Sequence, residues 1–201
     1  MTTTEYSQKA AIYALLGRIF ISELDLKSLQ ALQEQEISSI FEKLQEGSQS
    51  YLQHTKWNND EIEQLASDYC HLFILPQKSS LSLRASHWMT KDESANLAQL
   101  ETIIGSLDFD KSVVNADITA LPRDHLGVLL YFVSSVYRAD NSEIQKLGTQ
   151  LIQLSLLPWI LRFNEKLLVS TTNPLYLASG KLILELIDFE ELEEELLQKN
   201  A

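Results

Sequence analysis

The chain has 201 residues, of which 45% are hydrophobic, and its 16 basic and 28 acidic side chains give a formal net charge of −12. This length is sufficient for one domain, or two closely joined halves, with a substantial core. The acidic balance argues against a nucleic-acid partner, because the phosphates would be repelled. It is compatible with a basic peptide partner, which long-range attraction would steer to the surface, although plain solubility is the simpler interpretation.

The sequence has no feature of export, membrane insertion or disulfide chemistry. Cys70 is its only cysteine, so a disulfide framework cannot form. The N-terminal stretch MTTTEYSQKAAIYALLGRIF has neither a basic start nor a small-residue cleavage site. No run of about 18 apolar residues exists that would span a bilayer. We therefore expect a soluble cytoplasmic protein that does not insert into membranes.

Apolar residues at steps of three and four predict a series of helices in the first part of the chain. The predicted helices run from Thr3 or Thr4 to Phe20, over residues 24–32, over 37–52, and from Asn58 to Phe73. Pro76 ends the last of these. The serine-rich stretch 76–94 follows without a clear period, and a connection of this length in a compact domain is usually functional or mobile.

A further helix is predicted from Thr90 or Ser94 through Ile104, with Gly105 closing it. Residues 106–120 are irregular and predict a hinge. Beyond it, helices are predicted from Pro122 to about Arg138, over 142–156, over 159–169, and from Asn173 and Pro174 to an acidic end that should fray in isolation. The prediction is an all-α bundle of about eight to ten helices in two closely packed halves, 1–105 and 121–201.

The segment LPRDHLGVLLYFV, residues 121–133, places a proline, a carboxylate and an imidazole ahead of a strongly apolar helix. Proline suits the first helical position, because its missing N–H costs nothing there. Asp124 would then face the unpaired backbone donors of the first turn. These two residues are explained by a helix start, whereas His125 is not required for one.

A catalytic or metal-binding role for His125 is disfavoured. Adjacent helical residues point about 100° apart, so Asp124 would not orient the imidazole as the carboxylate of a triad does. The other histidines, His54, His71 and His87, have no metal-ligand spacing with one another or with Cys70. A glycine-rich phosphate loop is also absent. We expect neither an enzyme nor a metal site, and the remaining role for His125 is recognition.

Four segments together resemble the TorD/DmsD/NarJ-like family of chaperones for molybdenum-containing redox enzymes. They are ASDYCHLFILP (66–76), LPRDHLGVLLYFV (121–133), LSLLPWILRFNEKL (154–167) and NPLYLASGKLILELI (173–187), and they occur in the order typical of that family. The chain departs from the family pattern at Leu129, where an acidic residue is usual, and at Ser155, where histidine is common. Arg84 and Ala85 stand where tyrosine and glutamate often occur.

The resemblance implies a cytoplasmic, non-enzymatic chaperone of anaerobic respiration. It would bind the twin-arginine leader and the apo catalytic subunit of a molybdoenzyme, assist cofactor insertion and delay export. The implied leader-binding residues are Leu72, Phe73, Ser86, Trp88, Pro122, Asp124 and His125. For Leu72 and Phe73 a place in the core is the alternative interpretation, and for Trp88 core and groove are equally compatible with the sequence.

Several alternatives stay open at this point. A NarJ-like chaperone would serve a molybdoenzyme that is not exported, and a general helical adaptor would bind through the acidic terminal helix. A nucleotide hydrolase is disfavoured by the missing phosphate loop. The resemblance implies no cofactor beyond possible weak binding of guanine nucleotides. It is compatible with a monomer or a domain-swapped dimer.

Overall fold

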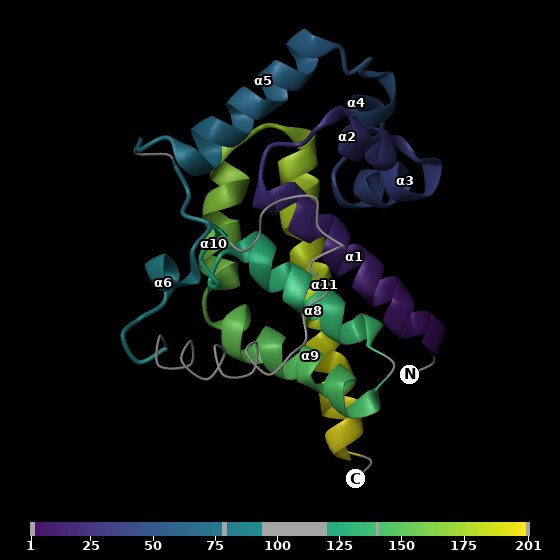
Figure 1. Ribbon diagram of the computed structural model, residues 1–201, viewed down its shortest axis with the longest axis vertical. Helices are drawn as coiled ribbons and strands as arrows, with labels where there is room; N and C mark the ends of the chain where they lie inside the picture. Colours follow the sequence, from purple (N-terminus) through teal and green to yellow (C-terminus); the bar gives the residue numbers. More distant parts are fainter. Residues whose placement is uncertain (1–2, 78–79, 94–119, 140, 200–201) are drawn as a thin grey trace. The chain divides into compact units, whose positions relative to one another are not determined.

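The computed structural model describes residues 3–77, 80–93, 120–139 and 141–199 (Figure 1). In these ranges the chain forms ten α-helices and a π-helix and contains no β-strand. The α-helices are α1 (Thr3–Ile21), α2 (Leu26–Gln33), α3 (Gln35–Leu44), α4 (Ser48–His54), α5 (Asn59–Tyr69), α6 (Ala85–Trp88), α8 (Leu126–Arg138), α9 (Ser142–Ser155), α10 (Leu157–Ser170) and α11 (Pro174–Lys199), and the π-helix is Cys70–Ile74. The predicted all-α class is confirmed. None of the described helices is both long enough and apolar enough to cross a membrane.

The chain folds into two compact units, each made of two separate stretches of sequence. The first unit comprises Met1–Ser22 and Ser82–Arg162, and the second comprises Glu23–Leu81 and Phe163–Ala201. The predicted hinge at 106–120 lies outside the described residues except for its last position. The division into halves 1–105 and 121–201 around that hinge therefore stays a prediction.

The first unit is built around the packing of α1 against α8. The two helices approach so closely that a Cβ atom on Gly127 would lie 2.8 Å from the backbone N and Cα of Ile21. The hydroxyl of Ser134 on α8 donates a buried hydrogen bond of 2.7 Å to the carbonyl of Ala10 on α1. Most of α8 is buried, which explains why its sequence is apolar on nearly every side.

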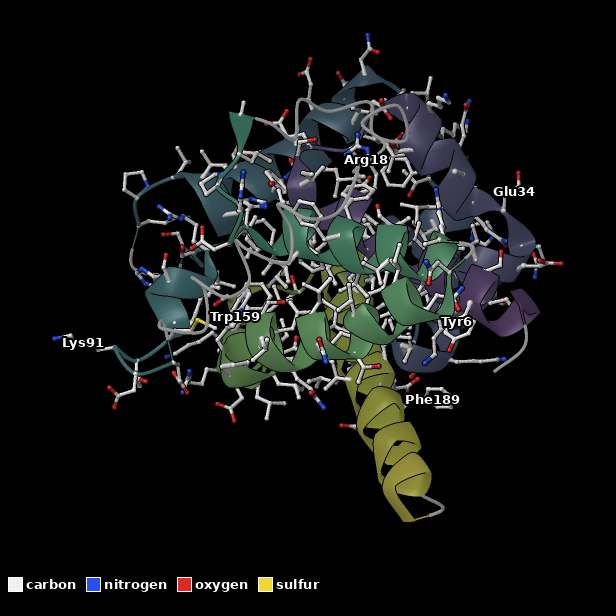
Figure 2. All side chains as sticks on the ribbon, turned by 60° about the horizontal axis from the view of Figure 1, so that its bottom comes forward. Tyr6, Arg18, Glu34, Lys91, Trp159 and Phe189 are labelled. Carbon is white, nitrogen blue, oxygen red and sulfur yellow. The ribbon has the colours of Figure 1, made fainter. Side chains whose placement is uncertain are left out.

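Trp159 on α10 is fully buried in the core of this structure. Figure 2 shows its side chain among the helices, whereas that of Lys91 projects from the surface. The indole Nε1 donates to the carbonyl of Ser155 at 2.5 Å, so the polar atom of this large ring is satisfied inside the core.

Helix boundaries in the second unit follow local capping chemistry. Asn58 accepts from the N–H of Glu61, and the carboxylate of Glu61 accepts from the N–H of Asn58. This capping box confirms the predicted start of α5. Asn173 accepts from the N–H of Leu175 and confirms the predicted start of α11.

One predicted helix of the second unit is wrong in extent. Residues 37–52 were expected to form a single helix, but they belong to α3 and α4, which are separate. Gly47 lies between them with a φ of 84°, a conformation that glycine adopts without strain. The carboxylate of Glu42 accepts from the N–H groups of Gly47 and Gln49, which fixes the turn.

Candidate functional site

In the first unit, the serine-rich segment meets the start of α8. Arg84 and His125 form an isolated antiparallel bridge. On either side of it, the N–H of Ala85 donates to the carbonyl of Asp124 at 2.9 Å, and the N–H of Leu126 donates to the carbonyl of Leu83 at 2.7 Å. These backbone bonds bring a segment without helical periodicity against the Pro-x-Asp-His motif.

The bridge changes the role of the residues ahead of α8. The helix begins at Leu126, with His125 in an extended conformation at the N-cap, so the prediction that Pro122 starts the helix is wrong. Pro122 instead begins a turn, in which its carbonyl accepts from the N–H of His125 at 3.0 Å. The physical reason is that the backbone of residues 124–126 pairs with residues 83–85, which holds it extended.

Asp124 does not cap α8 either, but it caps α6. Its Oδ2 accepts from the backbone N–H of Ser86 in the first turn of that helix at 3.1 Å. Its Oδ1 accepts from Nε of Arg84 at 3.1 Å. Burial opposes ionisation of Asp124, but the hydrogen bonds from Ser86 and the charge of Arg84 outweigh it and hold the pKa below its usual value. The carboxylate is therefore ionised at neutral pH.

His125 is buried and neutral. Only 8% of its surface is exposed, and burial lowers its pKa from 6.5 to about 4, against the attraction of the neighbouring Asp124. Its Nδ1 has no hydrogen-bond partner among the described residues. Because buried polar atoms are nearly always paired, this imidazole nitrogen is an unsatisfied hydrogen-bonding position in the fold.

Ser86 and Trp88 lie on α6, the helix that Asp124 caps. The side chain of Ser86 is exposed, and that of Trp88 is half-buried. The indole Nε1 of Trp88 donates to the carbonyl of Ser82 at 2.7 Å, which folds the segment back on itself. Ser86 thus contacts Asp124 through its backbone N–H, and Trp88 lies two residues further along the same short helix.

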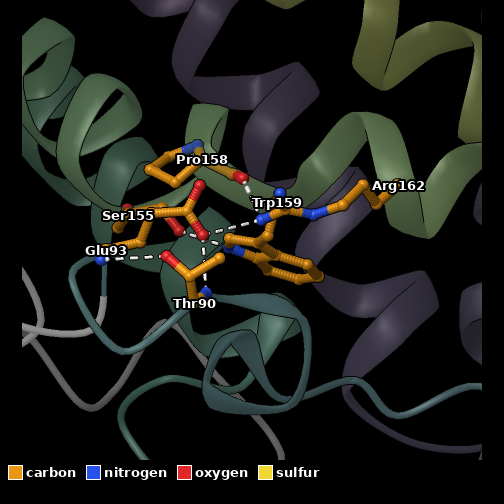
Figure 3. Close-up of polar contacts among 6 residues, drawn as sticks. All are labelled: Thr90, Glu93, Ser155, Pro158, Trp159 and Arg162. Carbon is orange, nitrogen blue, oxygen red and sulfur yellow. Dashed lines mark hydrogen bonds and ion pairs between the residues drawn. The ribbon is translucent and has the colours of Figure 1, made fainter.

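The far end of this segment is held to α10. Glu93 accepts from Nη2 of Arg162 at 2.9 Å, and Arg162 also donates to the carbonyl of Pro158 (Figure 3). Thr90 and Glu93 exchange backbone-to-side-chain hydrogen bonds in the pattern of a capping box. The helix predicted from Thr90 or Ser94 through Ile104 lies outside the described residues, except for its first positions up to Glu93. An ion pair therefore holds residues 84–93 at each end, Arg84 with Asp124 and Glu93 with Arg162.

Leu72 and Phe73 belong to the second unit, in the π-helix. Both are buried, and the ring of Phe73 makes edge-to-face contacts with Tyr69 and Tyr176. Phe73 is therefore part of the core of that unit, which was one of the two interpretations of the sequence. The assignment of Leu72 and Phe73 to leader binding stays a prediction.

Arg84 is the residue of this cluster that the sequence did not single out. The guanidinium of Arg84 is half exposed, at 54%, whereas the side chain of Asp124 is only 11% exposed. The only sign of this ion pair in the sequence was that Arg84 and Asp124 have opposite charges. Charge alone does not specify which residues of two distant segments pair. Among the described residues, no group of three or more His, Cys, Asp or Glu side chains is arranged to hold a metal ion.

Comparison with known proteins gives one family and a set of similar chaperones. The profile of the nitrate reductase delta subunit family matches residues 26–165. The chain is 26% identical to the chaperone protein TorD of Salmonella arizonae, over 94% of this chain and 92% of that protein. It is 26% identical to TorD of Shewanella piezotolerans, over 88% and 87% of the two chains. Identity to TorD of Pasteurella multocida is 29%, over 79% and 82%.

Proposed function

Because the chain belongs to the nitrate reductase delta subunit family, and so to chaperones of redox-enzyme maturation rather than to enzymes, we propose that it binds the N-terminal leader of an apo-oxidoreductase. The client is a molybdenum-containing catalytic subunit, and binding takes place in the cytoplasm before cofactor insertion and export. The leader is a twin-arginine segment, in which basic residues precede an apolar stretch. The second candidate is the NarJ-like variant, in which the client is not exported. Membership of the family supports both candidates equally.

The observation that carries this proposal is the unpaired Nδ1 of buried His125 beside an ionised Asp124. A neutral imidazole accepts a hydrogen bond from a guanidinium or a peptide N–H without repelling it. Asp124 supplies the negative charge, and the half-buried indole of Trp88 on α6 supplies apolar and π-face surface. Such a combination of aromatic, acceptor and carboxylate suits a segment that is basic and then apolar.

Titration calorimetry with a synthetic twin-arginine leader peptide tests the site. Asp124→Asn and His125→Ala should each weaken binding about tenfold or more, because each removes a desolvated acceptor of the leader. His54→Ala is the matched control, since His54 is an exposed histidine on α4, in the other unit. If both variants remain folded and bind the peptide as the wild type does, the leader does not bind at these residues.

Co-purification from the native host under anaerobic growth tests the identity of the client. Recovery of one molybdoenzyme catalytic subunit with its leader uncleaved is the expected result. A subunit without a leader would favour the NarJ-like variant. Finding no redox subunit, although such enzymes are expressed, would contradict both forms of the proposal.

A further inference from the structure

The second unit contains a cavity that the Asp124 site does not use. Its volume is about 480 Å³, which lies within the range of about 300 to 1,000 Å³ typical of ligand sites. It lies between α5, the π-helix and the connection from α10 to α11, which are all elements of the second unit. The cavity is lined by Tyr51 of α4, Asp68 of α5 and Leu72 of the π-helix, together with residues 170–174.

The cavity contains a carboxylate, Asp68, with which no described Lys or Arg forms an ion pair. Asp68 accepts hydrogen bonds from two neutral amides, Nε2 of Gln64 at 3.2 Å and Nδ2 of Asn173 at 2.9 Å. None of the residues lining the cavity is Lys or Arg, and no ion pair to Asp68 occurs within the described ranges. Asp124 differs in this respect, because it forms an ion pair with Arg84.

The hydroxyl of Tyr51 adds a second polar group beside this carboxylate. Its oxygen accepts from Nδ2 of Asn173 at 3.2 Å, the same nitrogen that donates to Asp68. Burial raises the pKa of Tyr51, and the negative charges of Asp68 and Glu61 raise it further against the hydrogen bond from Asn173. The two carboxylates, but not the burial, would favour a cation beside this hydroxyl.

Exposed apolar side chains flank the cavity in the sequence. Ile74 and Leu75 lie between the lining residues Leu72 and Gln77, and Leu168 and Val169 directly precede Ser170. These four are half of the eight large apolar side chains that are exposed in the described part of the chain, and Val169 is 81% exposed. Single exposed apolar residues are ordinary, but four that adjoin the lining residues in the sequence favour a binding surface here.

We propose that the cavity around Asp68 is a binding site for one arginine side chain of a partner polypeptide whose neighbouring residues are apolar. The guanidinium would lie against the Asp68 carboxylate, and the adjacent apolar residues would cover Ile74, Leu75 and Val169. Arginine suits the cavity better than lysine, because its five planar donors match a carboxylate and nearby hydroxyls such as those of Thr171 and Thr172. That the partner is the leader of the client rests on the proposed function, whereas the arginine site does not.

The test measures fluorescence anisotropy with the labelled peptide Ser-Arg-Arg-Ala-Leu-Leu-Leu-Ala and with the same peptide carrying citrulline in place of both arginines. Asp68→Asn should weaken binding of the arginine peptide about tenfold or more and leave binding of the citrulline peptide unchanged. Glu63→Gln is the matched control, because Glu63 is an exposed acidic residue of α5 outside the cavity. It should change neither affinity by more than about twofold.

A second variant tests the cavity by adding a positive charge instead of removing the negative one. Thr172→Arg places an internal guanidinium at the exposed rim and should also weaken binding of the arginine peptide about tenfold, so the result does not depend on Asp68→Asn folding normally. Wild-type affinity in a folded Asp68→Asn protein, or equal losses for arginine and citrulline peptides, would overturn the arginine site. If Asp68→Asn weakens binding while Asp124→Asn does not, the cavity stands and the leader site at Asp124 fails.

Discussion

His125 remains neutral in the folded protein at a pH where an unfolded histidine is already charged. Its pKa is about 4 in the fold against 6.5 unfolded. Above pH 6.5 both states are neutral, so the histidine adds no pH dependence. Below it the unfolded state binds a proton that the folded state does not, and stability is lost as the pH falls towards 4. The gap between the two pKa values corresponds to about 3 kcal/mol at pH 4.

His125→Gln should therefore remove part of the acid sensitivity of the fold. The free energy of unfolding of the wild type should fall by about 3 kcal/mol more than that of the variant between pH 7 and pH 4. Urea unfolding at four pH values in this range measures the difference. His87→Gln, which changes an exposed histidine, should follow the wild type. Parallel curves for His125→Gln and the wild type would mean that the imidazole is not held neutral.

Arg84 occupies the carboxylate to which the leader is proposed to bind. Arg84→Gln should strengthen binding of the leader peptide about two- to fivefold, because the leader would no longer compete with the half-exposed Arg84 for the Asp124 carboxylate. The control is Arg123→Gln, which removes the same charge from an exposed neighbour of Asp124. Affinities measured by calorimetry distinguish the two variants. Weaker binding by Arg84→Gln alone would make Arg84 part of the recognition surface instead.

At this scale the sequence indicated candidate residues, whereas the contacts that these residues make could not be predicted from it. Ser86, Trp88, Asp124 and His125 do lie on two segments that meet in one unit. The contacts of Asp124 were not predictable, because its partners come from an irregular segment and are chosen by a backbone bridge rather than by local periodicity. Arg84 was missed for the same reason.

At the scale of helices, the α1–α8 crossing depends on the absence of a side chain at Gly127. Gly127→Ala would place a Cβ 2.8 Å from backbone atoms of Ile21, and backbone cannot move aside as a flexible side chain does. We expect a loss of about 1 to 3 kcal/mol in the free energy of unfolding, measured by chemical denaturation. Ser135→Ala on the same helix removes only a hydroxyl that bonds to the Tyr131 carbonyl, and it should cost less than about 1 kcal/mol. Equal stabilities of the two variants would contradict this packing.

The starts of two helices were predictable because a side chain caps each of them. Asn58 and Asn173 mark the starts of α5 and α11 as expected, because their amide oxygens accept from the first turn. The start of α8 was placed too early, since pairing with residues 83–85 extends the backbone before Leu126. The break at Gly47 was also missed. Its signal was a single glycine, and glycine within a helical pattern does not always end a helix.

For the whole chain, the net charge of −12 is expected to affect the association rate of a basic leader more than its dissociation rate. Long-range attraction accelerates encounter and is screened by salt, whereas desolvated contacts mainly set the rate of dissociation. Raising the ionic strength should therefore slow association of the arginine leader peptide in stopped-flow measurements. The citrulline peptide should respond much less, because its diffuse attraction to the acidic surface is weaker.

Removing residues 189–201 separates this diffuse attraction from a specific role of the acidic terminal helix. Five of the removed residues are acidic and one is basic, so the net charge changes from −12 to −8. If the helix contributes charge alone, the truncated chain should associate more slowly at low salt, about two- to threefold, and dissociate at the wild-type rate. Complete loss of binding would instead favour the adaptor hypothesis, in which the terminal helix itself is the interface. Because the proposed contacts at Asp68 and Asp124 lie outside the deleted segment, an unchanged dissociation rate is what those contacts require.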